Sequence, residues 1–353
     1  MLVPRKRLYK ELTLKAIVYT GPRQFTVRDV SPPEPGPGEI LIRSTVTGVC
    51  GTDRHIHDGG FFAAYPLTPG HEIVGVVEVL GPDVVACYVG QQVAVDNATN
   101  CGVCDACGRD QPLFCTNFRS LGVNAPGGFA EYVVARADKC FPAEDIAAEA
   151  AVVAEPLACA VHGVDVLGLR PGSDVALVGS GPTGLLLAQL LLHGGAARMT
   201  VAGPTRFKLD LAESFGVDRT MLVDRDNPAA TAKGLQGLAP KGYDVAIDAT
   251  GSASVMQYLP GLVRDGGTVF VYGMADEDAR VSWSPYEIFR RQLTVKGSFA
   301  QIDCFDRSLA YLRSGRVKTE GIVTDRFPLD AYEDALSALR SPTTLKAIID
   351  HRL

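Results

Sequence analysis

The sequence predicts an α/β protein of two domains, one built mainly of short strands and one built on a doubly wound parallel sheet. With 353 residues, the chain is longer than a single hydrophobic core usually supports. Between Lys15 and about Val134, short runs of alternating polarity are separated by Gly, Pro and Asp, which is typical of a turn-rich β unit. From Asp174 onward, continuous apolar strands alternate with helices, which indicates a parallel sheet.

The individual segments support this division in chain order. Strands of the β-rich part are expected at 15–20, 39–49, 72–80, 91–96 and 129–134. In the second part, strands are expected at 174–179, 198–203, 244–251, 266–273 and 293–299, with helices at 184–194 and 206–216. A helix at 305–315 and a short closing stretch follow.

Composition excludes several classes of function. The net charge of −6 is mild, no basic stripe is present and there is one tryptophan, so we expect small-molecule rather than nucleic-acid partners. No window holds the roughly 18 uncharged apolar residues of a membrane span. Residues 1–14 are basic without the apolar region of a secretory signal, so we expect a disordered extension and a cytoplasmic protein. Nine cysteines in a reducing compartment do not describe a disulfide framework.

Four cysteines fall within residues 100–115, with the spacing C-x2-C-x2-C-x7-C. Four thiolates in one short loop can close a tetrahedral zinc site with no open position. The alternative, a redox motif, needs a C-x-x-C at the head of a helix, whereas this region is loop-like. The sequence therefore predicts a structural zinc in a lobe over about 97–118, bound by Cys101, Cys104, Cys107 and Cys115.

A glycine-rich turn after the first strand of the second domain predicts a dinucleotide site. Gly179 is expected to allow the tight turn, Gly181 the close approach of a pyrophosphate, and Gly184 the packing of helix against strand. Pro182 and Thr183 lie between the last two glycines, where the helix N-terminus attracts phosphate. This context, strand then helix, makes the motif far more specific than the glycines alone.

The second strand ends without the acidic residue that binds the ribose 2′-hydroxyl of NAD. Gly203 stands at that position, and Thr205 and Arg206 offer a hydroxyl and a guanidinium to a 2′-phosphate. The sequence therefore favours NADP over NAD. The alternative is that Arg206 is a solvated residue of the next helix and that cofactor choice is relaxed.

A second group of ligand types has the character of an open metal site. Cys50, His71 and Glu72 offer a thiolate, an imidazole and a carboxylate, and Glu155 offers another carboxylate near the domain junction. Three such ligands leave one position on zinc for water or a substrate oxygen. None of these residues alone indicates a metal site. The group does so because it occurs in the same chain as a dinucleotide-binding fold.

The chain resembles the zinc-containing medium-chain alcohol dehydrogenase family, and its polyol or sorbitol dehydrogenase branch most closely. The resemblance covers Lys15 to Leu353. It implies a GroES-like catalytic domain at 15–165 and 302–353, split around a Rossmann domain at 166–301. It also implies two zinc ions per chain, one catalytic in the cleft and one structural, and a homodimer or homotetramer. The motifs that carry it are "CGTDRH", "PGHEIVGVV", the four-cysteine loop, "GGFAEYV", "AEPLACAVHG", "VGSGPTGLL", "DATG" and "GGTVFVYG".

In this resemblance, Cys50 and His71 look like catalytic zinc ligands, and Glu72 or Glu155 completes the shell. Asp53 looks like the carboxylate that orients His71. Both glutamates remain candidates at this point.

Thr52 and His55 match the inner and outer positions of the family's proton relay. The implied reaction is hydride transfer between an alcohol and the nicotinamide ring, with the proton leaving through this relay. Ala300 replaces an arginine that contacts polyol in animal sorbitol dehydrogenases, so the substrate is left open among L-threonine, arabinitol, galactitol, a cyclitol and an aldose. The rival readings are a zinc-independent reductase and a non-catalytic dinucleotide-binding regulator, and retention of the ligand and relay residues favours an enzyme.

Overall fold

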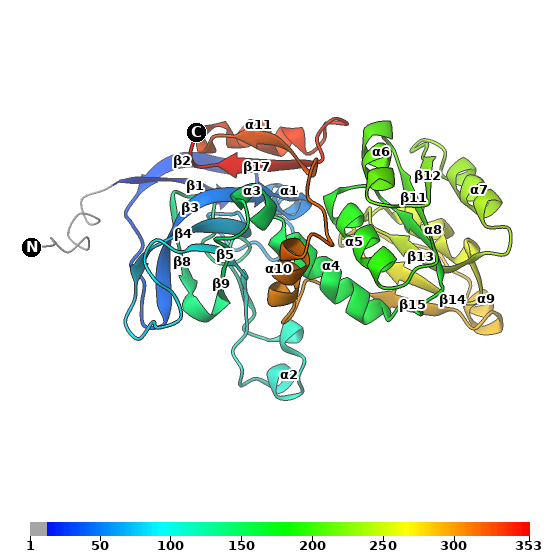
Figure 1. Ribbon diagram of the computed structural model, residues 1–353, viewed down its shortest axis with the longest axis horizontal. Helices are drawn as coiled ribbons and strands as arrows, with labels where there is room; N and C mark the ends of the chain where they lie inside the picture. Colours follow the sequence, from blue (N-terminus) through cyan, green and yellow to red (C-terminus); the bar gives the residue numbers. More distant parts are fainter. Residues whose placement is uncertain (1–12) are drawn as a thin grey trace, which may run out of the picture. The chain divides into compact units, whose positions relative to one another are not determined.

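The computed structural model describes residues 13–353, which divide into two compact units (Figure 1). The first unit contains the described residues up to Glu155, together with Phe305–Ser314 and Thr319–Leu353. The second unit contains Pro156–Cys304 and Gly315–Lys318. The first unit is therefore made from three separate parts of the chain.

A seven-stranded sheet forms the centre of the first unit, in the order β16-β17-β3-β4-β5-β9, and β8 also pairs with β3. β16 and β17 are parallel, and the other pairs are antiparallel. β3 and β4 coincide with the predicted strands 39–49 and 72–80. The strands of this unit are β1 (Leu14–Gly21), β2 (Gln24–Val30), β3 (Glu39–Val49), β4 (Glu72–Leu80), β5 (Gln92–Val95), β6 (Ala98–Thr99), β7 (Arg119–Ser120), β8 (Tyr132–Arg136), β9 (Cys140–Pro142), β16 (Val323–Phe327) and β17 (Lys346–Asp350).

A hairpin of β1 and β2 and several short helices complete this unit. Residues 1–12 of the predicted extension lie outside the described residues, whereas Leu14 is buried and already pairs with Val30. The first strand thus begins one residue earlier than predicted. The helices are α1 (Gly51–Asp58), α2 (Asp105–Gly108), α3 (Ala148–Ala151), α10 (Phe305–Arg313) and α11 (Tyr332–Ala338).

Strand β3 is almost wholly buried because it contributes to two apolar clusters. Ile40 and Ile42 belong to one cluster, whereas Val49 belongs to another that contains Tyr332. Alternate residues of a strand point to opposite faces, so these even and odd positions face different parts of the core. β3 is consequently held from both sides and provides a rigid base for the residues that follow it.

Six parallel strands form the sheet of the second unit, in the order β12-β11-β10-β13-β14-β15. The order reverses between β10 and β13, which is where doubly wound sheets bind dinucleotides. This confirms the predicted fold class. The elements are α4 (Ala154–Leu167), which begins at the boundary between the units, β10 (Asp174–Val178), α5 (Pro182–His193), β11 (Arg198–Gly203), α6 (Arg206–Ser214), β12 (Arg219–Leu222), α7 (Pro228–Leu238), β13 (Tyr243–Asp248), α8 (Ala253–Tyr258), β14 (Val263–Val271), α9 (Pro285–Arg290) and β15 (Thr294–Gly297).

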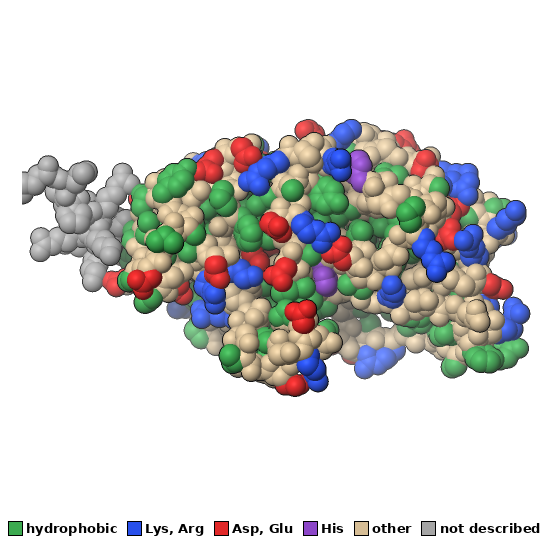
Figure 2. Space-filling model, turned by 60° about the horizontal axis from the view of Figure 1, so that its bottom comes forward, with side chains coloured by type: hydrophobic (Ala, Val, Ile, Leu, Met, Phe, Trp, Pro, Cys, Tyr) green, Lys and Arg blue, Asp and Glu red, His purple; other side chains and the backbone are tan. Residues whose placement is uncertain are grey.

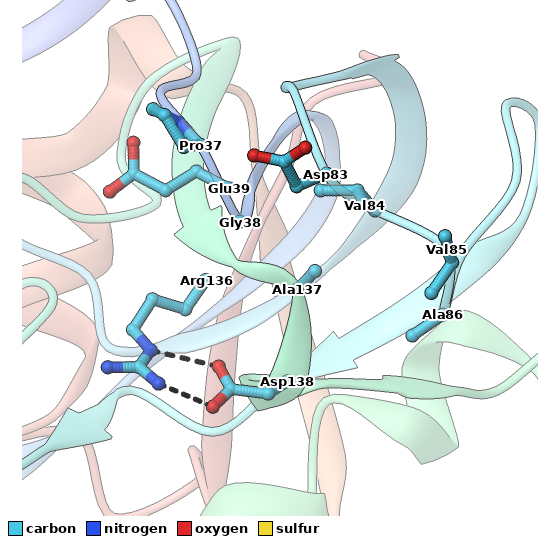
Figure 3. A pocket seen from close by; sticks show the side chains of 10 residues that line it. All are labelled: Pro37, Gly38, Glu39, Asp83, Val84, Val85, Ala86, Arg136, Ala137 and Asp138. Carbon is cyan, nitrogen blue, oxygen red and sulfur yellow. Dashed lines mark hydrogen bonds and ion pairs between the residues drawn. The ribbon is translucent and has the colours of Figure 1, made fainter.

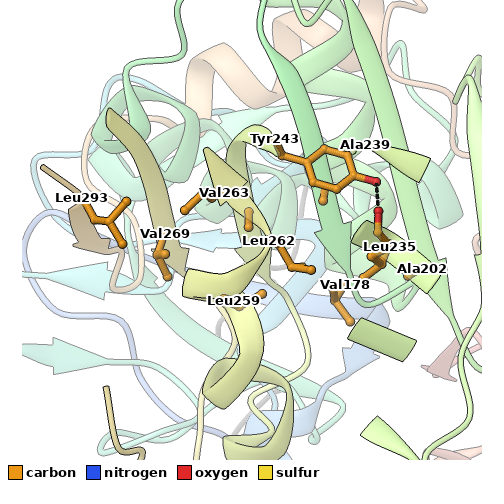
Figure 4. Packing of buried hydrophobic residues seen from close by; sticks show 12 residues of the cluster. Val178, Ala202, Leu235, Ala239, Tyr243, Leu259, Leu262, Val263, Val269 and Leu293 are labelled. Carbon is orange, nitrogen blue, oxygen red and sulfur yellow. Dashed lines mark hydrogen bonds between the residues drawn. The ribbon is translucent and has the colours of Figure 1, made fainter. Parts of the chain in front are cut away.

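Figure 4 shows the packing on one side of this sheet. Val178 and Ala202 come from the strands, and Leu235 and Leu259 pack against them from the connecting segments. Tyr243 is fully buried, and its hydroxyl donates to the Leu235 carbonyl at 3.1 Å. The phenol thus enters the apolar core without losing its hydrogen bond.

Charged side chains of both signs cover the face of the protein that Figure 2 presents. Figure 2 shows Lys and Arg side chains interspersed with Asp and Glu on the face it presents. A hollow of about 610 Å³ lies on the first unit between the loops at Gly38, Asp83 and Asp138 (Figure 3), and none of the residues that line it belongs to the predicted sites.

One helical stretch, Ala148–Leu167, is long and apolar enough to cross a membrane by length and composition. It contains 20 residues with a mean hydropathy of 1.6, and 61% of its most apolar window is buried inside the protein. A core helix that packs between other elements shows the same pattern.

We predict that His351 makes the fold less stable in acid. Thr47 Oγ1 donates to the Gly128 carbonyl at 2.9 Å and lies 3.2 Å from His351 Nε2, so the neutral imidazole donates Nε2–H to Thr47. Nδ1 is buried without a hydrogen bond, and burial lowers the pKa of His351 to about 4. This pKa is below the value of about 6.5 in the unfolded chain, so the unfolded state takes up a proton first as the pH falls. The contribution of His351 to the free energy of unfolding is therefore fully present above pH 6.5 and is lost as the pH drops toward 4.

The free energy of unfolding should fall by on the order of 2 kcal/mol between pH 7.5 and pH 5 through this group. Denaturant titration of His351→Gln should show a smaller fall over this range than the wild type. His193→Gln, in helix α5, is the control. Equal pH dependence in the wild type and His351→Gln would contradict the assignment.

Candidate metal and dinucleotide sites

The junction between β3 and α1 positions the first group of predicted residues. Cys50 is the N-cap of α1 and has an extended backbone (φ −122°, ψ 163°). Its backbone N–H donates to Asp53 Oδ2 at 2.8 Å, which satisfies one donor at the helix N-terminus. Gly59 ends the helix in the left-handed region (φ 98°), where glycine is favoured. A two-turn helix therefore starts directly at the end of a buried strand and fixes the Cys50 side chain.

His71 and Glu72 stand where β4 begins, beside the end of β3. Cys50 Sγ, a His71 ring nitrogen and a Glu72 carboxylate oxygen all lie within 4.8 Å of one another. His71 Nδ1 faces Asp53 Oδ1 at 3.5 Å, with both side chains buried, which leaves Nε2 as the nitrogen available to a metal. Burial lowers the pKa of His71, but Asp53 and Cys50 raise it by more, so that it lies well above its ordinary value.

This group fits a divalent metal such as zinc. It combines a thiolate donor, an imidazole and a carboxylate, and a second carboxylate faces the far nitrogen of the imidazole, as is usual for histidine ligands. Asp53 Oδ1 and His71 Nδ1 have no conventional hydrogen bond, although both atoms are buried. A cation bound at Nε2 would polarise the Nδ1–H group toward Asp53 and compensate for this.

Glu72 is held in a cradle that the sequence did not reveal. Its carboxylate lies over Gly48, which pairs with Glu72 across β3 and β4. A Cβ atom on Gly48 would lie 1.7 Å from Glu72 Oε2. Lys346 Nζ donates to Glu72 Oε1 at 2.6 Å, forms an ion pair with Oε2, and lies 3.3 Å from the Val49 carbonyl.

Lys346 carries a buried positive charge beside the predicted metal ligands. Its side chain is 2% exposed and that of Glu72 is 0% exposed. Burial lowers the pKa of Lys346, but Glu72, Cys50 and Glu155 raise it further, so the ammonium form is favoured.

Glu155 and the relay residues occupy nearby elements. Glu155 is in the first turn of α4 and influences Lys346 electrostatically, but the donor atoms within 4.8 Å of one another include Glu72 and not Glu155. Thr52 Oγ1 lies 3.8 Å from Cys50 Sγ. Thr52 and His55 are three residues apart on α1, so both side chains lie along one side of that helix.

The four cysteines of the second predicted metal site converge as expected for a closed shell. All four sulfur atoms lie within 4.8 Å of one another, and the pairs Cys104–Cys107 and Cys101–Cys115 are each 3.5 Å apart. These distances are longer than the sulfur–sulfur bond of a disulfide. They are close to the sulfur–sulfur distance of about 3.8 Å expected for four thiolates arranged tetrahedrally around zinc, with zinc–sulfur bonds of about 2.3 Å. Backbone N–H groups of Cys107 and Thr116 lower the pKa of Cys104 to about 6, which favours the thiolate.

The glycine-rich turn joins β10 to α5. Gly179 has φ 125°, and a Cβ atom added there would lie 2.7 Å from the carbonyl oxygen of Ala249, the residue that follows β13. A Cβ on Gly184 would lie 2.1 Å from the Gly179 carbonyl oxygen. Gly181, the N-cap of α5, has nothing within 4 Å of an added Cβ, and Pro182 and Thr183 open the first turn. Packing therefore requires two of the glycines, whereas the third faces open space at a helix N-terminus, which suits a pyrophosphate.

Gly203 ends β11 as predicted, and Ser180 fills the space beside it. A Cβ on Gly203 would lie 2.0 Å from Ser180 Oγ. Ser180 Oγ and Thr205 Oγ1 are buried and have no hydrogen-bond partner. Two unsatisfied hydroxyls beside the phosphate-binding turn fit a polar ligand such as the ribose of a dinucleotide.

Arg206 lies on the surface of α6 and is already paired. Its guanidinium contacts Asp210 and Glu213 on the same helix, each at 2.6 Å, with a side-chain exposure of 57%. Exposed ion pairs of this kind contribute little to stability.

Sequence reasoning missed three residues that shape these sites: Gly48, Ser180 and Lys346. Ser180 lies inside the glycine-rich turn, whose other residues gave the signal, and Gly48 lies two residues before Cys50. Lys346 is 274 residues from Glu72 along the chain, and no local pattern marks it.

Comparisons with known proteins show the family to which the chain belongs. Residues 36–145 match the alcohol dehydrogenase GroES-like domain, and residues 182–312 match the zinc-binding dehydrogenase family. D-arabinitol dehydrogenase 1 of Uromyces fabae is 42% identical over 337 residues, which cover 95% of this chain and 97% of that protein. D-altritol 5-dehydrogenase of Agrobacterium fabrum is 36% identical over 300 residues, or 83% and 86% of the two chains. The solved structure of a zinc-binding dehydrogenase from Sinorhizobium meliloti 1021 bound to NADP has a TM-score of 0.91 and 32% identity, covering 96% of this chain and all of that one.

We predict that Gly48→Ala disrupts the Glu72 cradle. The new methyl group cannot coexist with the Glu72 carboxylate at 1.7 Å, so Glu72 must leave Lys346 and a buried charge loses its partner. Loss of one partner of a buried pair costs roughly 3–5 kcal/mol. Thermal unfolding should show a lowered midpoint. Gly21→Ala, where an added Cβ meets only ordinary contacts at 3.8 Å, is the control, and equal midpoints for both variants would refute the cradle.

Proposed function

Because the chain belongs to the zinc-binding, medium-chain alcohol dehydrogenase family, we propose that it transfers a hydride between a polyol-type secondary alcohol and a nicotinamide cofactor. The relatives named for D-arabinitol and D-altritol support the substrate class. The observation that carries the proposal is the convergence of Cys50, His71 and Glu72 within 4.8 Å beside the buried carboxylate of Asp53.

In this proposal Cys50 and His71 hold a catalytic zinc, and one glutamate, Glu72 or Glu155, completes its protein ligands. When bound, zinc supplies Lewis acidity that lowers the pKa of an alcohol or polarises a carbonyl. Asp53 keeps the His71 tautomer that presents Nε2.

The chain's own residues provide a path for the substrate proton. Thr52 Oγ1, next to Cys50, accepts a hydrogen bond from the substrate hydroxyl and passes the proton toward His55. Hydride transfer needs the cofactor ring to be held in one orientation, and the glycine-rich turn before α5 anchors the pyrophosphate for this purpose.

A second zinc bound by Cys101, Cys104, Cys107 and Cys115 stabilises the lobe at about 97–118, giving two zinc ions per chain. The cofactor is NADP in preference to NAD, since Gly203 offers no carboxylate and Thr205 and Arg206 can reach a 2′-phosphate. The relative solved with NADP supports this choice.

We further propose catalytic and nucleotide-binding domains at 15–165 with 302–353 and at 166–301, and a cytoplasmic homodimer or homotetramer. Exposed aromatic side chains on α9, Tyr286 at 65% and Phe289 at 80%, support self-association.

The proposal is tested by initial rates on a panel of polyols, aldoses, a cyclitol and L-threonine, with NAD and NADP in parallel. Enzyme containing about two zinc ions per chain should oxidise a polyol. Thr52→Val should retain zinc but lose about 100-fold or more in kcat, because the relay hydroxyl is missing. Thr45→Val removes a buried hydroxyl without a hydrogen-bond partner and is the matched control.

Turnover of L-threonine, the cyclitol or the aldose alone would replace the polyol assignment with that substrate. Zinc at both sites with no turnover of any compound would support a non-catalytic regulator instead.

We predict that restoring an acid at Gly203 switches the cofactor only when Ser180 is also changed. Gly203→Asp alone places Cβ 2.0 Å from Ser180 Oγ, so this variant should unfold at a lower temperature. Ser180→Gly with Gly203→Asp removes the collision, and the new carboxylate should bind the 2′-hydroxyl and repel a 2′-phosphate.

In the double variant, the ratio of kcat/KM for NADP to kcat/KM for NAD should fall by about 10-fold or more. This corresponds to roughly one charged hydrogen bond gained with the 2′-hydroxyl of NAD and one lost with the 2′-phosphate of NADP. Ser180→Gly alone should keep the wild-type preference. A wild type that prefers NAD, or a double variant that still prefers NADP, would overturn the cofactor assignment.

A further inference from the structure

Two tyrosine hydroxyl groups are buried in the apolar core of the first unit. Tyr19, on β1, is 0% exposed, and Tyr332, the first residue of α11, is 1% exposed. Both belong to the apolar cluster that also contains Phe129. A phenylalanine would fill either position without bringing a polar group into the core, and a buried polar group is costly unless it forms hydrogen bonds. The two hydroxyls therefore need an explanation beyond packing.

The two hydroxyls form a hydrogen-bonded series with His57 on α1. The Tyr19 O–H group donates to the Tyr332 oxygen at 3.3 Å. Because Tyr19 has one hydroxyl proton, its oxygen must accept from His57 Nδ1, which lies 2.8 Å away and therefore carries a proton. We call His57, Tyr19 and Tyr332 the hydroxyl chain. Its N–H and O–H groups point in one direction, from His57 toward Tyr332.

The charge of Asp53 acts on the inner end of the hydroxyl chain. Asp53 and His57 are four residues apart on α1, so they occupy the same side of the helix. Burial raises the pKa of Tyr332 well above its ordinary value, and the negative charge of Asp53 raises it further. Asp53 Oδ1 is buried and has no hydrogen bond. In the field of this anion, the Tyr332 O–H dipole is most stable with its hydrogen directed toward Asp53.

Asp53 also faces the imidazole that would bind the catalytic metal. Its Oδ1 atom lies 3.5 Å from His71 Nδ1. A carboxylate that gives more of its negative charge to one donor offers less to another. Resting on the proposed metal site, we infer that the hydroxyl chain is a set of positioning groups that limits the hold of Asp53 on His71, and that a proton gained by His57 strengthens this limit.

His57 can change its charge because it lies at the edge of the cluster and is half-buried. Its ring contacts those of Tyr19 and Phe25, with centroids 5.9 and 6.1 Å away. Burial lowers the pKa of His57 below its ordinary value, and the charged groups that face it divide evenly: Asp58 on α1 and Glu333 on α11 raise this pKa, whereas Arg54 on α1 and Arg23 between β1 and β2 lower it. The second proton therefore binds below about pH 6.5. A charged imidazole is a stronger donor, and hydrogen bonds in series polarise one another.

Tyr332→Phe tests the hold of Asp53 on His71, because it removes one hydroxyl and keeps the ring. Asp53 then gives more of its charge to His71, which becomes a stronger metal ligand. Cobalt(II) at the catalytic site should be lost to a chelator about threefold more slowly than from the wild type, a smaller effect than the roughly 10- to 100-fold change expected when a group that touches a ligand is replaced. A hydroxyl with a purely structural role would produce faster metal loss or no change.

The visible spectrum of the cobalt protein tests the link to His57. Between about pH 7.5 and pH 5, the wild-type spectrum should change with the same midpoint as the NMR signal of the His57 Cε1 proton. Tyr19→Phe interrupts the hydroxyl chain, so His57 should still titrate while the spectrum no longer follows it. His57→Gln keeps an amide donor for Tyr19 but cannot take up a proton. This variant at a half-buried position should also lose the spectral change, and it preserves the test if Tyr19→Phe folds poorly.

Tyr65→Phe is the matched control. The Tyr65 ring lies 6.4 Å from that of Tyr19, but its hydroxyl donates to the Ile56 carbonyl at 2.6 Å and is not part of the hydroxyl chain. This variant should lose stability while it keeps the metal retention and the pH response of the wild type.

Three results would overturn the role of the hydroxyl chain and leave the proposed function intact: faster or unchanged metal loss from Tyr332→Phe, a wild-type spectrum that does not change at the His57 midpoint, or a Tyr19→Phe spectrum that still follows His57. A wild-type protein that binds metal only at the four cysteines would instead overturn the proposed function, and this inference with it.

Discussion

The pairing of three adjacent strands, β17, β3 and β4, fixes the positions of Cys50, His71, Glu72 and Lys346 in the candidate catalytic metal site. Gly48 of β3 pairs with Glu72 of β4, and Cys50 and His71 lie one or two residues from that pair. Lys346 opens the third strand on the other side of β3. A shift of one residue in either pairing would turn Glu72 or Lys346 to the opposite face of the sheet. Residues from distant parts of the sequence meet because the sheet has one register.

The candidate dinucleotide site of the second unit is built by a different principle. Here the essential feature is space rather than donor atoms: Gly181 faces an open volume at the start of α5, and Gly203 leaves room that Ser180 partly fills. The N-terminus of α5 attracts phosphate, and the reversal of the strand order between β10 and β13 determines where the crevice for the ligand lies. One unit therefore holds the predicted metal ligands by strand register, and the other offers a cradle by omitting side chains.

The sequence was sufficient for the fold class, and most of the residues that it singled out as metal ligands lie together in the structure, although Glu155 is not among the donor atoms that cluster with Cys50, His71 and Glu72. Glycine spacing and runs of apolar residues are local signals, and a thiolate, an imidazole and a carboxylate remain recognisable wherever the chain places them. Helix α1 was not predicted as an element, because eight residues rich in polar side chains give no clear apolar period. Lys346 had no signal either, since a lysine in a strand is normally exposed and its partner lies 274 residues away. Similarly, the sequence could not show that Arg206 is paired along its own helix.

The two groups of metal-ligand residues in this chain illustrate two solutions to one electrostatic problem. In the loop of four cysteines, the donor atoms surround one point and backbone N–H groups stabilise the negative sulfur, so a bound cation would be fully enclosed. At Cys50, His71 and Glu72, three donors converge, and Glu72 also faces the buried ammonium group of Lys346. An enzyme site that must admit a substrate has to leave one position unfilled. Three protein ligands would leave that position open, and the buried ion pair between Glu72 and Lys346 balances the charge of the carboxylate at a place from which water is excluded.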